Sequence, residues 1–268
     1  MESEEYLHTN RDSWNSRTEY HLNSEFYDVK AFLEGKNSLR EIELALLGDV
    51  KGKKILHLQC HFGQDTLSLA RMGAKVTGVD FSDRAIQAAV DLNEKLGLNA
   101  EFFCCDIYSL PVCLRETFDL VFTSYGTIGW LPDIRRWAGI VASYLKPGGK
   151  FVFAEFHPTL WMFDNDFKTV AYSYFNREPI VEELQGTYAD PTAPIKKKSI
   201  TWNHDLGEVL GNLIEQGLTV EHFSEYDFSP YPCFADMVEL EPGRYYLKGM
   251  EHKLPMVYAL RAIKNQSL

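Results

Sequence analysis

The feature that most constrains the fold is one stretch, residues 54–80, with the sequence KILHLQCHFGQDTLSLARMGAKVTGVD. An apolar run at 55–58 leads into a short turn, a helical pattern at 65–71, and a second apolar run at 75–79 that ends at Asp80. Neighbouring parallel strands need a crossover of this kind, so the stretch predicts a βαβ unit. Ligands of open α/β sheets bind where the strands end, and a carboxylate there can accept hydrogen bonds from both hydroxyls of a ribose. The unit therefore predicts a site for a nucleoside-containing cofactor.

The turn inside this unit limits which cofactor it can hold. Its sequence is QCHFGQ, with one glycine. A dinucleotide turn needs G-x-G-x-x-G, so that backbone amides and a helix N-terminus can hold a pyrophosphate. The sequence also has no G-x-x-x-x-G-K-[ST] phosphate loop. These observations disfavour NAD and FAD, and they leave S-adenosylmethionine, which carries ribose and adenine without a phosphate.

Further landmarks follow the turn in a fixed order. They are Asp80-Phe81 after the second strand, Asp106-Ile107 after a third strand at 101–105, Ser124-Tyr125-Gly126 after a fourth strand at 118–122, and the turn LKPGGK at 145–150 before a fifth strand at 151–155. Together, over about 46–157, they resemble the class I S-adenosylmethionine-dependent methyltransferases. The resemblance implies an α/β fold with a seven-stranded Rossmann-like sheet of order 3-2-1-4-5-7-6, its last strand antiparallel, and helices on both faces.

The resemblance also implies which residues bind the cofactor. Asp80 would accept from the ribose hydroxyls, and Phe81 would pack on the adenine. Asp106 would accept from the adenine amino group, with Ile107 as its apolar neighbour. The remaining expected cofactor residues lie in the first turn and after the fourth strand: Gln59, Cys60, His61, Gly63 and Tyr125.

The first family motif, acid-x-Gly-x-Gly-x-Gly, falls on residues 57–63 and is altered. His57 replaces the acid, while Gln59 and His61 replace the first two glycines, so only Gly63 is kept. A neutral imidazole at His57 can orient the turn through one nitrogen. The added side chains leave an alternative open: a non-catalytic protein that keeps the fold for nucleoside binding or assembly. A dinucleotide oxidoreductase is a third, weaker alternative.

Composition narrows the partners. The chain has 38 acidic and 27 basic residues, a formal net charge of −11, which suits a small-molecule substrate better than nucleic acid. No apolar run approaches the roughly 20 residues that span a bilayer, and the acidic start lacks the features of a signal peptide, so we expect a cytoplasmic protein. The five cysteines include no C-x-x-C, and His57, Cys60 and His61 lack tetrahedral spacing, so we expect neither disulfides nor a metal.

Three regions are expected in the 268 residues. Residues 1–48 form N-terminal helices, 49–157 and 204–268 the methyltransferase core, and 158–203 a cap insertion. Alternation at 167–175 and 195–202 predicts a small antiparallel cap rich in aromatics. A homodimer interface through the same insertion is the competing interpretation.

Two N-terminal features carry further expectations. Ser38, with Glu41 three residues later, predicts a capping box at the start of a helix. The resemblance makes Trp14 and Tyr20 parts of a lid over the cofactor. Packing of that helix on the sheet through its aromatics is the equal alternative.

The catalytic residues are the least constrained part of the site. Positioning supplies much of the rate of an in-line methyl transfer, and a general base is needed only if the acceptor starts protonated. His157, after the fifth strand, is the first candidate base, because imidazole titrates near neutral pH. His204 is the second and His21 the third. Each also has a structural interpretation, as a hydrogen-bonded or packed histidine. The sequence therefore predicts an S-adenosylmethionine-dependent methyltransferase that acts on an unidentified small molecule.

Overall fold

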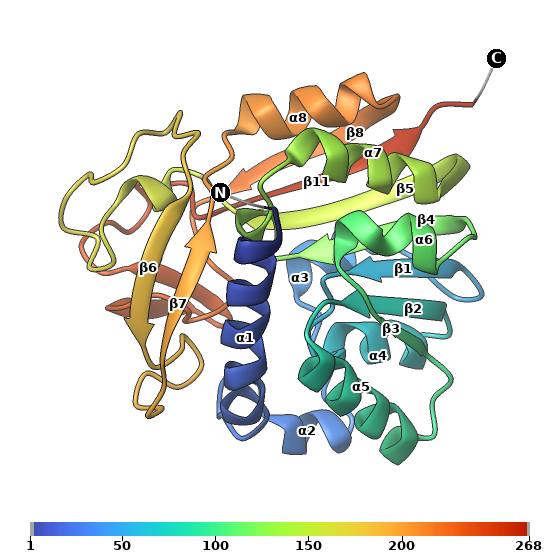
Figure 1. Ribbon diagram of the computed structural model, residues 1–268, viewed down its shortest axis with the longest axis horizontal. Coiled ribbons are helices and arrows are strands. Elements are labelled where there is room, and N and C mark those ends of the chain that lie inside the picture. The colour runs from blue at the N-terminus through green and yellow to red at the C-terminus, as the bar shows by residue number, and fades with distance from the viewer. Residues whose placement is uncertain (1–2, 267–268) are drawn as a thin grey trace.

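A seven-stranded sheet forms the centre of the computed structural model, which describes residues 3–266 (Figure 1). Its strands are β1 (Lys54–Leu58), β2 (Lys75–Asp80), β3 (Glu101–Cys104), β4 (Phe118–Ser124), β5 (Leu145–Phe156), β8 (Leu218–Tyr226) and β11 (Val257–Lys264). Their order is β3-β2-β1-β4-β5-β11-β8. The first five are parallel, and β11 pairs antiparallel with both β5 and β8. The predicted strand order and inserted antiparallel strand are confirmed.

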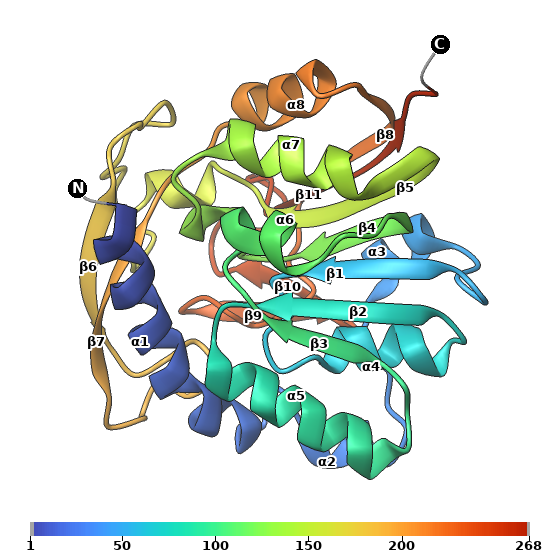
Figure 2. The ribbon, with the colours of Figure 1, turned by 45° about the vertical axis from the view of Figure 1, so that its right-hand side comes forward.

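Helices cover both faces of this sheet. They are α1 (Ser3–Leu22), α2 (Val29–Leu33), α3 (Glu41–Leu47), α4 (Gln64–Arg71), α5 (Asp83–Leu96), α6 (Leu110–Cys113), α7 (Ile134–Tyr144) and α8 (Leu206–Glu215), with three short 3₁₀ segments, η1 (Ile107–Ser109), η2 (Ile128–Trp130) and η3 (Leu160–Met162). Figure 2 shows α7 and α8 on one face and α3 and α4 on the other. Among residues 3–266, no helix has both the length and the apolar character needed to cross a bilayer.

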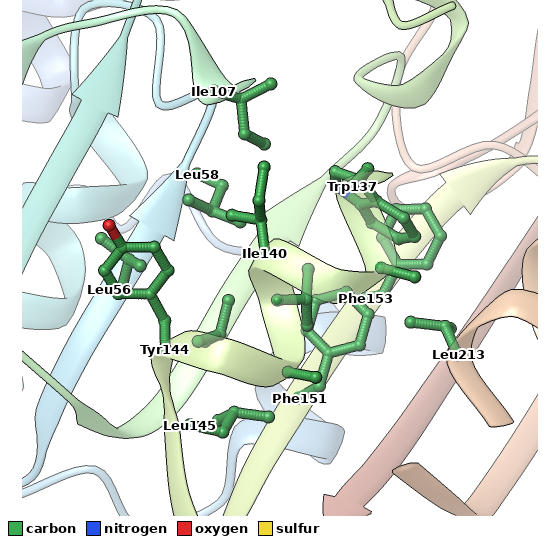
Figure 3. Close-up of a cluster of buried hydrophobic side chains, with 14 of the residues drawn as sticks. Leu56, Leu58, Ile107, Trp137, Ile140, Tyr144, Leu145, Phe151, Phe153 and Leu213 are labelled. Atoms are coloured by element: carbon green, nitrogen blue, oxygen red, sulfur yellow. The ribbon is translucent and has the colours of Figure 1, made fainter. Parts of the chain in front are cut away.

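The central strands are apolar along their length because they are buried on both faces. In β5, Phe151 and Phe153 face the cluster around α7, whereas Val152 and Ala154 face the cluster around α3. Trp137 of α7 is fully buried, with its ring centre 5.7 Å from that of Phe151 and 5.4 Å from that of Phe153 (Figure 3). This packing anchors β5 against α7.

Helix α1 and a hairpin of β6 (Ile180–Gln185) and β7 (Lys196–Thr201) lie across the carboxyl ends of the parallel strands (Figures 1 and 2). Asn10 joins the two elements: its side-chain nitrogen donates to the Ile200 carbonyl at 2.8 Å, and its oxygen accepts from the Ile200 amide at 2.9 Å. The helix therefore packs on the hairpin and does not pack flat on the sheet.

Two local predictions are wrong. Residues 167–175 form no strand, because the Asp164 carboxylate accepts from the backbone of Lys168 and Thr169 and bends this segment into turns. The partner of β7 is β6 instead. The N-cap of α3 is Arg40 and not Ser38, since the Glu43 carboxylate accepts from the Arg40 amide at 2.9 Å. Between β8 and β11 there is a second hairpin, β9 (Met237–Glu241) and β10 (Arg244–Leu247).

Candidate active site

A cavity of about 470 Å³ lies between the strand ends, α1 and the cap hairpin. Its walls come from the turn after β1, the ends of β2, β4 and β5, helix α1, the cap and the loop after β8. The structure brings most of the predicted site residues to this cavity: Gln59, Cys60, His61, Gly63, Asp80, Phe81, Tyr125 and His204. Trp14 of the predicted lid also lines it.

The turn after β1 has an unusual backbone. Gln59, His61 and Gly63 have φ angles of 55°, 50° and 78°, in the left-handed region. L residues enter this region at a cost of roughly 1–2 kcal/mol, and glycine enters it freely. These are the three glycine positions of the family motif, and all three have a left-handed backbone here although two of the glycines are replaced. Gly63 has no substitute, because a Cβ there would lie 2.8 Å from the Phe102 ring.

The two substituted positions make new contacts. The Gln59 side chain donates to the Thr127 carbonyl at 2.7 Å, and its own oxygen is buried without a partner. His61 Nε2 lies 2.9 Å from Nδ1 of His21 on α1. Burial lowers the pKa of both imidazoles, that of His21 to about 3, so the pair is neutral and one ring donates to the other. His61, which stands in place of a motif glycine, therefore connects the turn to α1.

The carboxylate at the end of β2 is buried, and part of its hydrogen-bonding capacity is used by backbone amides. Asp80 Oδ2 accepts from the His61 amide at 2.8 Å, and Oδ1 accepts from the Ser82 amide at 2.9 Å. Burial raises the Asp80 pKa to about 6, against the effect of these hydrogen bonds. The group is therefore ionised at neutral pH. Each carboxylate oxygen keeps acceptor capacity for the hydroxyls of a ligand in the cavity.

At the family's acid position, His57 is buried in β1, and its Nδ1 lies 2.8 Å from Thr66 Oγ1 on α4. Burial lowers its pKa to about 3, so the imidazole is neutral. One ring nitrogen therefore ties the strand to the helix that follows the turn. Cys60 is also buried, and burial raises the pKa of its thiol, which suits a packed side chain better than a nucleophile.

Arg17 of α1 was not singled out by its sequence context, and it lines the cavity. It is 7% exposed, and its guanidinium carbon lies 5.3 Å from the Trp14 ring centre and 5.5 Å from that of Trp130. Within the described residues, no carboxylate is in ion-pair distance of it. Burial lowers its pKa. A buried charge without a partner is costly, so Arg17 fits an anionic group of a ligand.

The loop after β4 is held by one carboxylate at the end of β5. Glu155 accepts hydrogen bonds from the backbone amides of Gly126, Thr127, Ile128 and Phe156 and from the Thr127 hydroxyl. Burial raises its pKa, and the four amide donors oppose the shift. Glu155 therefore fixes the loop that carries Tyr125.

The first two candidate bases have occupied ring nitrogens. His157 Nε2 lies 2.8 Å from Glu225 Oε1 of β8, and its Nδ1 lies 2.9 Å from Thr159 Oγ1. It is outside the residues that line the cavity. His204 lines the cavity, with Nε2 at 2.8 Å from the Leu131 carbonyl and Nδ1 at 3.1 Å from Glu208. A catalytic role for either histidine stays a prediction, and these contacts support positioning of the strand and helix ends.

Two of the three predicted adenine residues, Asp106 and Ile107, do not line the cavity, whereas Phe81 does. Asp106 is the N-cap of η1 and accepts from the Ser109 amide at 3.1 Å. Ile107 is buried in the cluster around α7. Their contact with adenine stays a prediction.

Comparison with known proteins agrees with this geometry. Residues 55–149 match the family model described as "Methyltransferase domain". The chain is 32% identical over 140 residues to the ubiquinone biosynthesis O-methyltransferase of Coxiella burnetii; the match covers 52% of this chain and 56% of that protein. The chain thus spans little more than half the length of this curated relative.

Solved structures share the fold across most of the chain. A putative S-adenosylmethionine-dependent methyltransferase from Listeria monocytogenes is similar with a TM-score of 0.61 and 18% identity, over 84% of this chain and 96% of that one. The DhpI–SAH complex is similar with a TM-score of 0.58 and 16% identity, over 99% and 100%. The matched segment and the strand order agree with the fold of S-adenosylmethionine-dependent methyltransferases.

Proposed function

We propose that this protein transfers the methyl group of S-adenosylmethionine to a small molecule. The observation that carries the proposal is the left-handed backbone at Gln59, His61 and Gly63, beside the buried carboxylate of Asp80. When bound, the cofactor supplies an activated methyl group on a sulfonium. The described residues would hold it: Asp80 at the ribose, Phe81 at the adenine and Arg17 at the carboxylate of the methionine end.

The cavity also contains buried polar atoms without partners, which fits a polar ligand. They include the side-chain oxygen of Gln59, Nδ1 of His61 and the Tyr258 hydroxyl. Buried polar groups in folded proteins are usually paired, so these atoms suit hydrogen bonds to a bound molecule. The protein would orient donor and acceptor and exclude water between α1, the cap and the strand ends.

The non-catalytic alternative depends on the two replaced glycines. The backbone at Gln59 and His61 is nevertheless left-handed, a conformation that glycine enters freely, which favours a functional cofactor site. Two further points remain part of the proposal. The net charge of −11 supports a partner other than nucleic acid. Exposed apolar side chains on the cap, including Phe175 and Val181, support a homodimer through this insertion.

Calorimetric titration with S-adenosylmethionine, S-adenosylhomocysteine and NAD tests the cofactor. We expect micromolar binding of the first two and none of NAD, because the turn has no room for a pyrophosphate. Binding of NAD instead would support an oxidoreductase. Failure of all three to bind would overturn the proposal and favour the non-catalytic alternative.

Arg17→Gln should weaken binding of S-adenosylhomocysteine about ten- to hundred-fold, the effect of losing a charge-assisted hydrogen bond of about 1.5–3 kcal/mol. Binding of 5′-methylthioadenosine, which lacks the methionine carboxylate, should not change. Arg11→Gln, an exposed position on the same helix, is the matched control. Equal losses for both ligands would show that Arg17 does not bind the carboxylate.

A further inference from the structure

A buried carboxylate lies behind the cavity wall at Tyr125. Glu43 of α3 has no exposed surface, and its Oε2 accepts a hydrogen bond from the Tyr125 hydroxyl at 2.8 Å. Its other oxygen accepts from the Arg40 amide at 2.9 Å. Among residues 3–266, no cation lies within ion-pair distance of Glu43. Burial raises its pKa to about 7, and Asp65 adds to the shift.

Tyr125 connects this carboxylate to the cavity. It lines the cavity at the end of β4, and its backbone is left-handed, with φ 43°. Its ring centre lies 5.7 Å from that of Phe156 and 5.3 Å from that of Tyr231, which meets it edge-on. The Glu155 contacts fix the backbone just after it. The Tyr125 side chain is therefore held in a fixed position in the cavity wall.

The cavity wall next to Tyr125 is aromatic. Phe156, Trp161 and Phe234 all line it, and their ring centres are 5.1 to 6.1 Å apart. Tyr231 continues the same wall, under the guanidinium of Arg40 at 4.9 Å. Flat aromatic ligands pack well against such rings, in offset or edge-on contact. This part of the cavity suits a planar aromatic acceptor.

We propose that Tyr125 and Glu43 take the proton of a hydroxyl group on an aromatic ring, so that the protein is an O-methyltransferase for phenols. This inference rests on the proposed function. As the acceptor oxygen bonds to the methyl carbon, its proton passes to Tyr125 Oη, and the Tyr125 proton passes to Glu43 Oε2. The electrons of the broken carbon–sulfur bond stay on the sulfur of S-adenosylhomocysteine. Glu43 ends protonated, which balances the lost sulfonium charge.

Other buried groups in the site are less suited to this role. Glu155 is occupied by five donors, and the ring nitrogens of His157 and His204 are engaged. Asp65 is less suited because its carboxylate accepts from the Ser124 hydroxyl at 3.4 Å, whereas the Tyr125 hydroxyl donates to Glu43. The ionisable groups facing Glu43 from neighbouring elements are Asp65 on α4, Tyr125 at β4, Arg40 before α3, Tyr226 on β8 and Tyr231 in the loop after β8.

Methylation of matched acceptors tests the acceptor atom. The full-length protein is given tritium-labelled S-adenosylmethionine with phenol, catechol or 2-naphthol, and with aniline, 1,2-phenylenediamine or 2-naphthylamine. The two sets share ring shapes and differ in the acceptor atom. We expect methylation of at least one hydroxyl compound, above its amine counterpart. Methylation of the amines alone, or of no compound by a protein that binds S-adenosylhomocysteine, would overturn the inference and leave the cofactor assignment intact.

Variants of the pair test its role. Glu43→Gln and Tyr125→Phe should each lower kcat about a hundred-fold or more, as expected for loss of a proton acceptor. In the unchanged protein the rate should fall below pH 7, where Glu43 becomes protonated, and Glu43→Gln should lose this fall. The affinity of Glu43→Gln for S-adenosylhomocysteine, measured by calorimetry, should differ less than two-fold from that of the unchanged protein. Glu41→Gln, an exposed position on the same helix, is the control. An unchanged pH profile in Glu43→Gln, with Tyr125→Phe fully active, would overturn the proton role.

Discussion

Asp80→Ala should weaken binding of S-adenosylhomocysteine a hundred-fold or more. The carboxylate is placed to accept two hydroxyl hydrogen bonds, and charge-assisted bonds contribute about 1.5–3 kcal/mol each. Loss of both removes about 3 kcal/mol, which is on the order of a hundred-fold in affinity. The substitution also leaves the amides of His61 and Ser82 without their acceptor. Calorimetric titration of Asp80→Ala and of the unchanged protein with S-adenosylhomocysteine measures the loss of affinity.

The pH dependence of the same binding offers an independent check. The Asp80 pKa is raised to about 6, so the group is ionised above this value and protonated below it. Affinity should therefore fall as the pH drops below 6, and Asp80→Asn should bind weakly without this dependence. Asp91→Ala, exposed on α5, should behave like the unchanged protein. Full affinity in Asp80→Ala would rule out the ribose assignment.

Glu155→Ala should lower the free energy of unfolding by about 3 kcal/mol or more. The carboxylate accepts from four backbone amides and one hydroxyl, all in buried surroundings. A buried donor left without a partner costs about 1–3 kcal/mol, and several are left here. Denaturation in urea measures the effect. Binding of S-adenosylhomocysteine should weaken as well, because the loop that carries Tyr125 loses its anchor.

A matched substitution separates this effect from a general loss of negative charge. Glu215→Ala, exposed at the end of α8, should change the unfolding free energy by less than about 0.5 kcal/mol. A loss below 1 kcal/mol in Glu155→Ala would mean that water replaces the carboxylate, and the loop would then not depend on it.

The sheet could be predicted because its signals are local and repeated. Strands buried on both faces need continuous apolar runs, and the predicted strand at 118–122 lies within β4. The cap could be predicted only in part. Residues 167–175 alternate like a strand, yet the side chain of Asp164 bends the chain there. Alternation in a single segment does not show whether a partner strand lies beside it.

The site residues also fall into those that could be predicted from the sequence and those that could not. Asp80 and the first turn could be located, because a βαβ unit places them by itself. Arg17 and Glu43 could not, since their importance comes from burial without a charged partner, which depends on distant segments. The role of Glu155 could not be predicted either, because its five donors lie mostly in another loop. Asp106 follows the family pattern in sequence, but its carboxylate caps η1.

The non-glycine residues in the turn after β1 have a consequence for the energetics of ligand binding. Glycine loses more backbone freedom on ordering than any other residue, so a glycine-rich loop has much to lose when a ligand fixes it. Gln59 and His61 are restricted by their own side chains and by contacts to Thr127 and His21. The strain held in their left-handed backbone is a property of the free protein. The entropy lost when a ligand arrives should accordingly be smaller than for the three-glycine turn of the family.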